Sequence, residues 1–470
     1  MAGEKIYIGP KIRELRQARG LTQAQFAHAL GVSASYVNLI ERNQRSASVK
    51  FLVALSDTFG INWRQLTQGD QSLAIADLRQ ITRDPAFGEH HPDIEELRSA
   101  IDNSPNLVRG LFSLFRTYRD YGERLSSQLE ANAPTEGGSL ASEEVVLRFF
   151  RARNNYFENV EACAAQTLPY ADIDRDELYG ILKVHLRAKL GVSASTVPPG
   201  EIGSGLRYFD RDKNTIFLSE GLDYTNKVFQ LAHTIALIEH SDALNAEIED
   251  ANISDKRAVA RCRVELANYF AAALMMPYDD FYGEALSSKY DIDYLATRFQ
   301  VSYEHVCHRL TTLQKPGARA IPFFMLRVDR AGNVTKRFNA TPIQLARYGG
   351  TCPRLDVHYC FRVAGRIMTQ MIEMPDNARY LTINRTVDRP SLRFTREDNR
   401  LALCLGCAIE HAGETIYGAN LDIHAETEAT EVGINCRLCP RRGCVQRANE
   451  PFFENLLVDE NRRGMTRFES

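Results

Sequence analysis

The stretch from Gly20 to Ser48 constrains the fold of this chain more tightly than any other part of it. Thr22 is a residue type that favours a helix N-cap, and apolar residues recur after it at helical spacing until Gly31 ends the run. A second helix is predicted to begin at Ser33 or Ser35, and a short fifth helix of the same domain is predicted around Trp63 and Leu66. Two short helices with a glycine-containing turn between them indicate a helix-turn-helix, whose second helix enters the DNA major groove.

The same stretch resembles the repressor-like helix-turn-helix domains of the Cro and phage-repressor type, in which LTQ opens the second helix and an Ile-Glu or Leu-Glu pair closes the third. The resemblance implies that Gln23 anchors a phosphate, that polar side chains of the next helix face bases or sugar-phosphate, and that two arginines bind the backbone. The implied DNA-binding residues are Gln23, Ser33, Ser35, Tyr36, Asn38, Arg42 and Arg45. The alternative is an ordinary surface hairpin of an enzyme, which is disfavoured because spacing, caps and polar face all agree.

The charge pattern also favours a DNA partner at this end of the chain. Residues 1–66 carry nine Lys and Arg against four Asp and Glu, whereas the net charge of all 470 residues is -3. The basic character is therefore local, and the rest of the chain is acidic.

A long apolar face follows between residues 105 and 129, where leucine and aromatic side chains recur at helical spacing. Helix-turn-helix proteins commonly bind two half-sites as dimers, so we expect a homodimer or higher homo-oligomer with this segment as a dimerisation or bridging helix. Packing of this face against the following domain of the same chain is the alternative. The small, polar stretch 131–140, ANAPTEGGSL, then predicts a linker.

A loop rich in Ser, Pro and Gly is expected after Leu190 as far as Gly205, and helices are expected over 224–239 and 256–275. These two helices carry the frame of a zinc peptidase without its chemistry. Such enzymes place two histidines four residues apart on one helix, with a glutamate after the first as general base. Here His233 holds the first ligand position, but Thr234 replaces the base and Leu237 replaces the second histidine. Glu265 matches the third ligand of the ImmA/IrrE-type peptidase family, which residues 140–280 resemble. We therefore predict no catalytic residues and no enzyme activity, and an active zinc peptidase is the disfavoured alternative.

A fold of this kind would retain a concave site that suits ligand sensing. Basic side chains beside an apolar cavity fit an acyl chain attached to phosphates, because Arg and Lys pair well with phosphate oxygens. The candidate ligand-binding residues are Arg207, Tyr208, Lys227, His233, Arg261 and Tyr269.

The strongest metal signal is the CxxCxxxxC array of Cys436, Cys439 and Cys444. Three thiolates within nine residues converge when something binds them, and a tetrahedral zinc ion or an iron-sulfur cluster are the two candidates. The fourth ligand is expected to be Cys407 or Cys404 in the CLGC motif, with Cys352 in GGTCP as the second choice.

The combination of these features resembles, over nearly the full length, the short-chain fatty acyl-responsive transcription regulators. The matching stretches are SYVNLIERNQR, the LAHTIAL helix, RLTTLQKPGARAIPFFMLRVDRAGN and INCRLCPRRGCVQRA. The resemblance implies a bacterial regulator that senses a short-chain acyl-CoA such as propionyl-CoA and controls genes of short-chain acyl-CoA and propionate metabolism. Some members carry a four-iron cluster, so the resemblance favours such a cluster on the cysteine-rich segment.

We therefore predict a multidomain α+β protein. The expected parts are an all-α helix-turn-helix domain at 1–70, a helical bridging segment at 71–130, a mainly α, degenerate ImmA/IrrE-like sensor domain with a β-hairpin at 140–315, and an α+β cysteine-rich domain at 316–470. No apolar run approaches the roughly 20 residues that cross a bilayer, so we expect a cytoplasmic protein without a membrane partner.

The leading function hypothesis is a DNA-binding regulator controlled by an acyl-CoA. A redox or iron sensor, in which an iron-sulfur cluster is the signal, is the second hypothesis.

Overall fold

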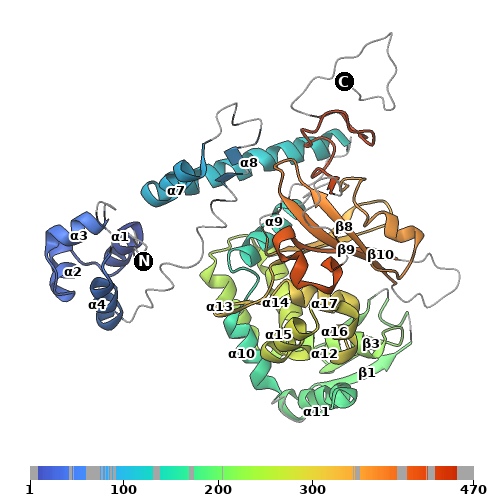
Figure 1. The fold of residues 1–470 in the computed structure, drawn as a ribbon. Coiled ribbons are helices and arrows are strands. Elements are labelled where there is room, and N and C mark those ends of the chain that lie inside the picture. Colours follow the sequence, from blue (N-terminus) through green and yellow to red (C-terminus); the bar gives the residue numbers. More distant parts are fainter. Residues whose placement is uncertain are drawn as a thin grey trace, which may run out of the picture. The chain divides into compact units, whose positions relative to one another are not determined.

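The computed structural model describes residues 9–41, 45, 47–59, parts of 75–87, 92–130, 138–168, 174–198, 200–203, 205–341, 343, 350–388, 400–419, 421 and 429–451. The chain divides into two compact units, Met1–Leu125 and Ser126–Ser470. Figure 1 shows the helices of the first unit and the mixed helix and sheet structure of the second. The predicted multidomain α+β class is confirmed.

The first unit opens with the helix-turn-helix. Its described elements are α1 (Gly9–Ala18), α2 (Gln23–Ala29), α3 (Ala34–Glu41) and α4 (Val49–Phe59), which share one core. Thr22 caps α2 as predicted, because its side chain accepts from the N–H of Gln25 while the Gln25 side chain bonds back. Gly31 makes the turn at φ 65°, a conformation that glycine adopts without steric cost. The fifth helix expected around Trp63 and Leu66 lies outside the described residues.

The helices α7 (Ile94–Asn103) and α8 (Pro105–Glu130) follow. Val108 of α8 packs with Leu78 and Leu97 in a small separate core. Leu107 and Leu114, which the sequence placed on the apolar face, are 75 % and 67 % exposed. These two side chains therefore do not pack into the core of this unit, and the side chains from residue 121 to 130 lie outside the described residues.

The second unit begins with a helical layer around the buried helix α14. The described helices are α9 (Gly138–Arg151), α10 (Glu158–Thr167), α11 (Leu178–Leu190), α12 (Tyr224–Glu239), α13 (Ser241–Asp250), α14 (Lys256–Met275), α15 (Tyr278–Ser287), α16 (Ile292–Phe299) and α17 (Tyr303–Leu310). Helix α9 starts inside the predicted linker. The last ten residues of α14 from Leu266 are almost all buried, so this helix is the centre of the core.

A buried ion pair ties this layer together. Arg309 of α17 is fully buried, and its Nη1 and Nη2 donate to the two carboxylate oxygens of Glu161 on α10 at 2.6 and 3.0 Å. The hydroxyl of Tyr269 on α14 donates to the same carboxylate at 2.6 Å. Because each buried charge has a partner, this network crosslinks three helices without an uncompensated charge.

A small sheet lies beside α12 and has the order β1-β3-β2 among the described strands. The predicted hairpin is confirmed as β2 (Arg207–Asp210) antiparallel to β3 (Thr215–Ser219). Strand β1 (Ser193–Val197) pairs in parallel with β3 in a segment that the sequence indicated as a loop. Its residues SASTV show no clear alternation, so pairing with β3 rather than local pattern decides its conformation.

The C-terminal part is built on a larger sheet, ordered β11-β8-β9-β10-β6-β7 in the described residues. Its strands are β6 (Phe323–Val328), β7 (Val334–Asn339), β8 (Met368–Glu373), β9 (Arg379–Val387), β10 (Leu401–Ala408) and β11 (Thr430–Glu431). Side chains alternate across it: Phe323 and Leu403 join the core of the helical layer, while Phe324 and Ala402 form a second core on the other face. The two short strands β4 (Gln314–Lys315) and β5 (Ala318–Arg319) precede it.

No helix in the described part of the chain has the length and apolar content to cross a membrane.

Candidate functional site

Helix α3 presents the polar side chains expected to meet DNA. Ser33 and Ser35 are exposed with their hydroxyl oxygens 3.0 Å apart, and Asn38 is half-buried. The Ser33 hydroxyl also accepts from the N–H of Tyr36 at 3.2 Å, so it caps the start of α3. Arg42 lies outside the described residues.

Tyr36 has an internal partner. Its hydroxyl donates to the Ser48 hydroxyl at 3.2 Å, and its ring packs edge-on against Phe51 of α4. The guanidinium of Arg45 stacks over the same ring, 5.1 Å from its centroid. Tyr36 therefore links α3 to α4, and its ring holds Arg45 at the exposed end of the helix pair.

A second internal hydrogen-bond network joins Glu41 at the end of α3 to α1 and α2. Glu41 is 7 % exposed and receives the Nε of Arg16 at 2.6 Å and the Nε2 of Gln23 at 2.7 Å. The hydrogen bond from Arg16 to Glu41 raises the pKa of the arginine, with burial opposing it. Gln23, expected at a phosphate, thus bonds to Glu41 in the free protein. Arg16 was not singled out in the sequence, where nothing marks a partner 25 residues away.

Arg207 of β2 contacts the residues that stand at the metal-ligand and general-base positions of a zinc peptidase, His233 and Thr234. Its Nη1 donates to Nδ1 of His233 at 2.8 Å, to Oγ1 of Thr234 at 2.6 Å and to the backbone oxygen of Gln230 at 3.3 Å. Thr234, standing where the general base would be, in turn donates to the Gln230 oxygen at 2.7 Å. A guanidinium therefore holds together the side chains that would flank a metal in a peptidase.

The protonation of His233 follows from these contacts. Burial and the neighbouring Arg207 cation lower the pKa of His233 to about 3, although a hydrogen bond with the backbone of Val264 opposes this. Since Arg207 can only donate, Nδ1 must be the acceptor and the ring is neutral with its proton on Nε2. Burial also lowers the pKa of Arg207, and no acidic group contributes to that shift. Among the described residues, no carboxylate pairs with this half-buried cation.

The other predicted ligand-binding residues are spread more widely. Tyr208 is 55 % exposed beside Arg207, and Lys227 is half-buried on α12. Arg261 is exposed and pairs with Glu143 at 3.3 Å, whereas Tyr269 is fully buried and bonded to Glu161. The structure therefore brings Arg207 and His233 together but places Tyr269 in the core, where it has no surface to offer a ligand.

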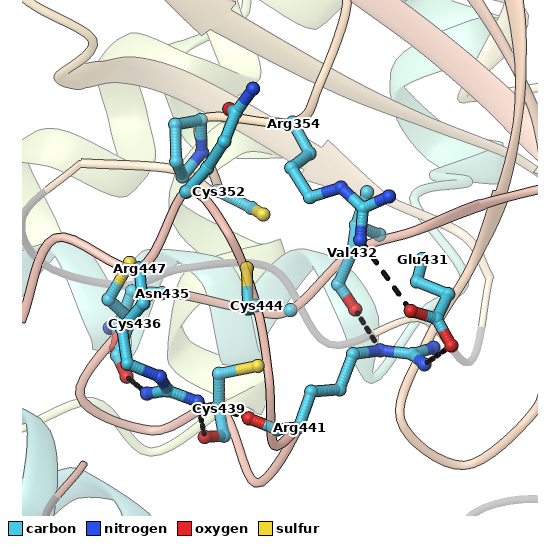
Figure 2. A pocket seen from close by; sticks show the side chains of 13 residues that line it. Cys352, Arg354, Glu431, Val432, Asn435, Cys436, Cys439, Arg441, Cys444 and Arg447 are labelled. Atoms are coloured by element: carbon cyan, nitrogen blue, oxygen red, sulfur yellow. Dashed lines mark hydrogen bonds and ion pairs between the residues drawn. The ribbon is translucent and has the colours of Figure 1, made fainter. Parts of the chain in front are cut away.

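The cysteine-rich end forms a cavity whose lining includes Cys352, Cys436, Cys439 and Cys444. Figure 2 shows the side chains of Cys352, Cys439 and Cys444 directed into it. Cys352 comes from a segment 84 residues before Cys436, so the fold supplies the fourth thiol that the local sequence lacks. Burial raises the pKa of Cys352 and of Cys439, and neighbouring thiols add to this in both cases.

Cys407, expected first as the fourth ligand, does not line this cavity. It is fully buried in β10 between Phe323 and Leu381, on the face that meets the helical layer, and burial raises its pKa to about 12. Cys404 lies in the second core of the sheet. Residues three apart on a strand point to opposite faces, so the CLGC motif cannot bring both thiols to one site.

Two arginines shape the cysteine loop (Figure 2). The buried Arg447 donates to the backbone oxygens of Cys436 at 2.9 Å and of Cys439 at 3.2 Å, and also to that of Arg441. Arg441 donates to the backbone oxygens of Glu373 at 2.8 Å and Met374 at 3.0 Å at the end of β8, and pairs with Glu431. Arg447 therefore fixes the conformation of the cysteine loop, and Arg441 attaches this loop to the end of β8.

The donor set suits a thiolate-bound metal group. Backbone N–H groups of Gly433 and Arg354 bond to the Cys352 sulfur, and that of Ala448 donates to the Cys436 sulfur at 3.5 Å. A side chain at Gly433 would meet the Cys439 sulfur at 2.5 Å, so the loop needs glycine there. In the described residues no three His, Cys, Asp or Glu side chains are already arranged around one metal ion. The cavity therefore has the ligands and the hydrogen bonds of such a site without its closed geometry.

Comparison with known proteins agrees with this layout. Residues 12–66 match the helix-turn-helix family, residues 187–311 the IrrE N-terminal-like domain, and residues 312–468 the short-chain fatty acyl coenzyme A regulator, C-terminal, family. The propionyl-CoA carboxylase regulator of Cereibacter sphaeroides is 37 % identical over 99 % of both chains. The chain belongs to the short-chain fatty acyl coenzyme A regulator family.

Two further relatives of this regulator come from Mycobacterium tuberculosis. The HTH-type transcriptional regulator RamB is 33 % identical over 97 % of both chains, and PrpR is 32 % identical over 97 % of this chain and 94 % of its own. A solved Mycobacterium tuberculosis transcriptional regulator matches with a TM-score of 0.65 and 32 % identity, over 70 % of this chain and 99 % of that one. The regulator is thus a helix-turn-helix, DNA-binding transcription regulator.

The regulator is not an enzyme. Its relatives over nearly full length are named as regulators rather than peptidases, and the peptidase frame has Thr234 in place of the base. Glu265, the third ligand position, instead accepts a hydrogen bond from Asn268 at 3.1 Å.

Proposed function

We propose that this transcription regulator binds its operator as a homodimer in the cytoplasm, and that a short-chain acyl-CoA, propionyl-CoA first, sets its affinity for DNA. It would thereby control genes of short-chain acyl-CoA and propionate metabolism. One relative is named as a propionyl-CoA carboxylase regulator, which supports this choice of ligand.

The observation that carries the proposal is the half-buried Arg207 cation, for which the described part of the chain supplies no acidic partner. Within the described residues, its hydrogen bonds to protein all come from Nη1, which leaves the Nε and Nη2 edge to face a ligand. That edge matches the two oxygens of a phosphate or carboxylate, and desolvation makes such a pair stronger than it is in water.

A ligand shifts DNA binding only through different affinities for two arrangements of the protein. Arg207 belongs to β2 and bonds to His233 and Thr234 of α12. A ligand on its free edge would therefore favour one placement of the β2–β3 hairpin relative to α12. We propose that this change in the placement of the hairpin alters the affinity of the helix-turn-helix for DNA.

Isothermal titration calorimetry with propionyl-CoA, acetyl-CoA and free CoA tests the ligand. We expect propionyl-CoA to bind at micromolar protein, and Arg207→Gln to weaken it about tenfold to a hundredfold, since a charge-assisted pair contributes about 1.5–3 kcal/mol. Arg211→Gln removes the same charge from the exposed β2–β3 turn and is the matched control. Absence of acyl-CoA binding to the native protein would refute the ligand, and an unchanged Arg207→Gln variant would refute the site.

A second candidate function is favoured by the four-thiol cavity. We propose Cys352, Cys436, Cys439 and Cys444 as ligands of an iron-sulfur cluster, a four-iron one by family resemblance, with zinc as the alternative. Each iron of a cluster takes its own thiolate, so the thiols need not approach one another as they do around a zinc ion at 2.3 Å. Such a group would supply redox chemistry or a structural crosslink.

Anaerobic purification separates these possibilities. A visible absorption band from a cluster, with DNA affinity that changes when the cluster is oxidised away, would support a redox or iron sensor. A colourless protein with stoichiometric zinc, or DNA affinity indifferent to cluster loss, would exclude the sensor.

A further inference from the structure

Two side chains outside the cysteine set hold the backbone on which the four thiols are mounted. Arg447 is 7 % exposed, although arginine is rarely buried without paired charge. Its hydrogen-bond partners among the described residues are backbone oxygens, two of them those of cysteines. The hydrogen bonds of the guanidinium therefore fix the backbone conformation of the cysteine loop.

The geometry of Arg447 explains why an arginine is needed. Nη1 reaches the oxygen of Cys436 and Nη2 reaches those of Cys439 and Arg441, so the planar fork fixes the two ends of the CxxC segment relative to one another. A lysine ammonium is a single point with three rotatable donors and cannot set the spacing of carbonyls in this way. The positive charge also lies beside the sulfur atoms that must become thiolates.

Cys352 is held by a different residue. The ring of His358 shares a 2.8 Å hydrogen bond with the Thr351 hydroxyl and bonds to the backbone of Cys352. Gly332, at the β6–β7 turn, lies against this ring: a side chain added to the glycine would meet Cε1 of His358 at 3.2 Å. The fourth thiol is therefore placed by a histidine that the large sheet supports.

We propose that Arg447 and His358 are positioning residues that hold the cavity of Cys352, Cys436, Cys439 and Cys444 close to the arrangement in which it binds a thiolate-ligated metal. Arg447 sets the CxxC segment, and His358 sets Cys352. This inference rests on the proposed metal site but adds residues that do not touch the metal. Groups of this kind, which orient ligands from outside, typically change metal affinity tenfold to a hundredfold when replaced.

Cobalt(II) titration of the full-length, metal-free chain tests the inference. Thiolate-bound Co²⁺ gives visible and near-ultraviolet bands that report the number of sulfur ligands, independently of DNA binding. We expect one Co²⁺ per native chain, and a dissociation constant tenfold to a hundredfold higher for Arg447→Met. Arg447→Lys should resemble Arg447→Met, because the fork rather than the charge alone is required.

His358→Phe keeps an aromatic ring but removes both hydrogen bonds, and we expect it to weaken Co²⁺ binding and to reduce the thiolate bands toward those of a Cys352→Ser variant. The matched control is Arg442→Met, an exposed arginine of the same loop, which should bind Co²⁺ as the native chain does. Thermal unfolding of each metal-free variant should stay close to native, so that lost affinity reports the site.

The outcomes are distinct. Native affinity in Arg447→Met and His358→Phe overturns the positioning role while leaving the metal site intact. A Co²⁺ dissociation constant for Arg447→Lys equal to that of the native chain overturns the role of the planar guanidinium and leaves the positive charge as the requirement for metal binding. A native chain that binds neither Co²⁺ nor an iron-sulfur cluster on anaerobic reconstitution overturns both this inference and the proposed metal site.

Discussion

At the scale of single residues, the charged groups that matter most are those whose partners come from distant segments. Arg309 pairs with Glu161 across 148 positions, and Arg207 bonds to His233 across 26. In each case a cation is taken out of water. Arg309 finds oxygen partners for all three guanidinium nitrogens, whereas Arg207 bonds to its neighbours through Nη1. The first pair stabilises the fold, and the second joins β2 to the helix position that carries a metal ligand in zinc peptidases.

Glu161→Gln tests the structural pair. The change leaves the fully buried Arg309 without a countercharge, and breaking a buried pair in this way typically costs about 3–5 kcal/mol. Urea denaturation of the native and variant chains measures the loss. Glu158→Gln, at an exposed position on the same helix, should change the free energy of unfolding by less than about 1 kcal/mol. A similarly small loss for Glu161→Gln would show that the buried charge is solvated or paired elsewhere.

At the scale of elements, helix caps and turn residues made the bounds of several helices predictable from the sequence. The expected helices over 224–239 and 256–275 have the same bounds as α12 and α14, because each begins at an aspartate N-cap and follows a continuous helical pattern. Strand β1 was missed, since parallel pairing with a distant strand decides its conformation.

Strand β10 offers a test of sheet packing. A side chain at Gly406 would meet the ring of Phe324 at 2.3 Å and the backbone oxygen of Leu381 at 2.8 Å. Gly406→Ala should therefore destabilise the C-terminal sheet by about 1–3 kcal/mol through overpacking. Chemical denaturation followed by tyrosine fluorescence and circular dichroism measures it, and Gly413→Ala, where the added atom meets nothing within 4 Å, is the control. Equal stability of the two variants would contradict the tight approach of β6 and β10.

At the scale of the whole molecule, the chain joins a DNA-reading end to a large unit that has lost its peptidase chemistry. Regulation requires that the two communicate, and the covalent route between them runs through α8. The exposed Leu107 and Leu114 on that helix are apolar surface in the N-terminal unit. A second copy of the chain is the partner that a two-fold operator would demand.

Size-exclusion chromatography with light scattering tests the dimer. We expect a mass twice the 53.1 kDa of one chain, and a DNA footprint over two half-sites about 10 base pairs apart or a multiple of that. The double variant Leu107→Ser with Leu114→Ser should shift the mass toward one chain and weaken operator binding. Leu206→Ser, an exposed leucine of the second unit, is the control. A native protein that stays monomeric with and without operator DNA would refute the homodimer.

The sequence by itself determined the helix-turn-helix, the degenerate peptidase frame and the cysteine triplet. Those features are local: N-caps, helical periods and short spacings act over a few residues and remain visible without a fold. Only the tertiary structure brought Cys352 rather than Cys407 to the triplet, joined Gln23 to Glu41, and placed Arg207 against His233 and Thr234. These contacts depend on which faces of strands and helices meet, and strand pairing and core packing between distant segments decide that.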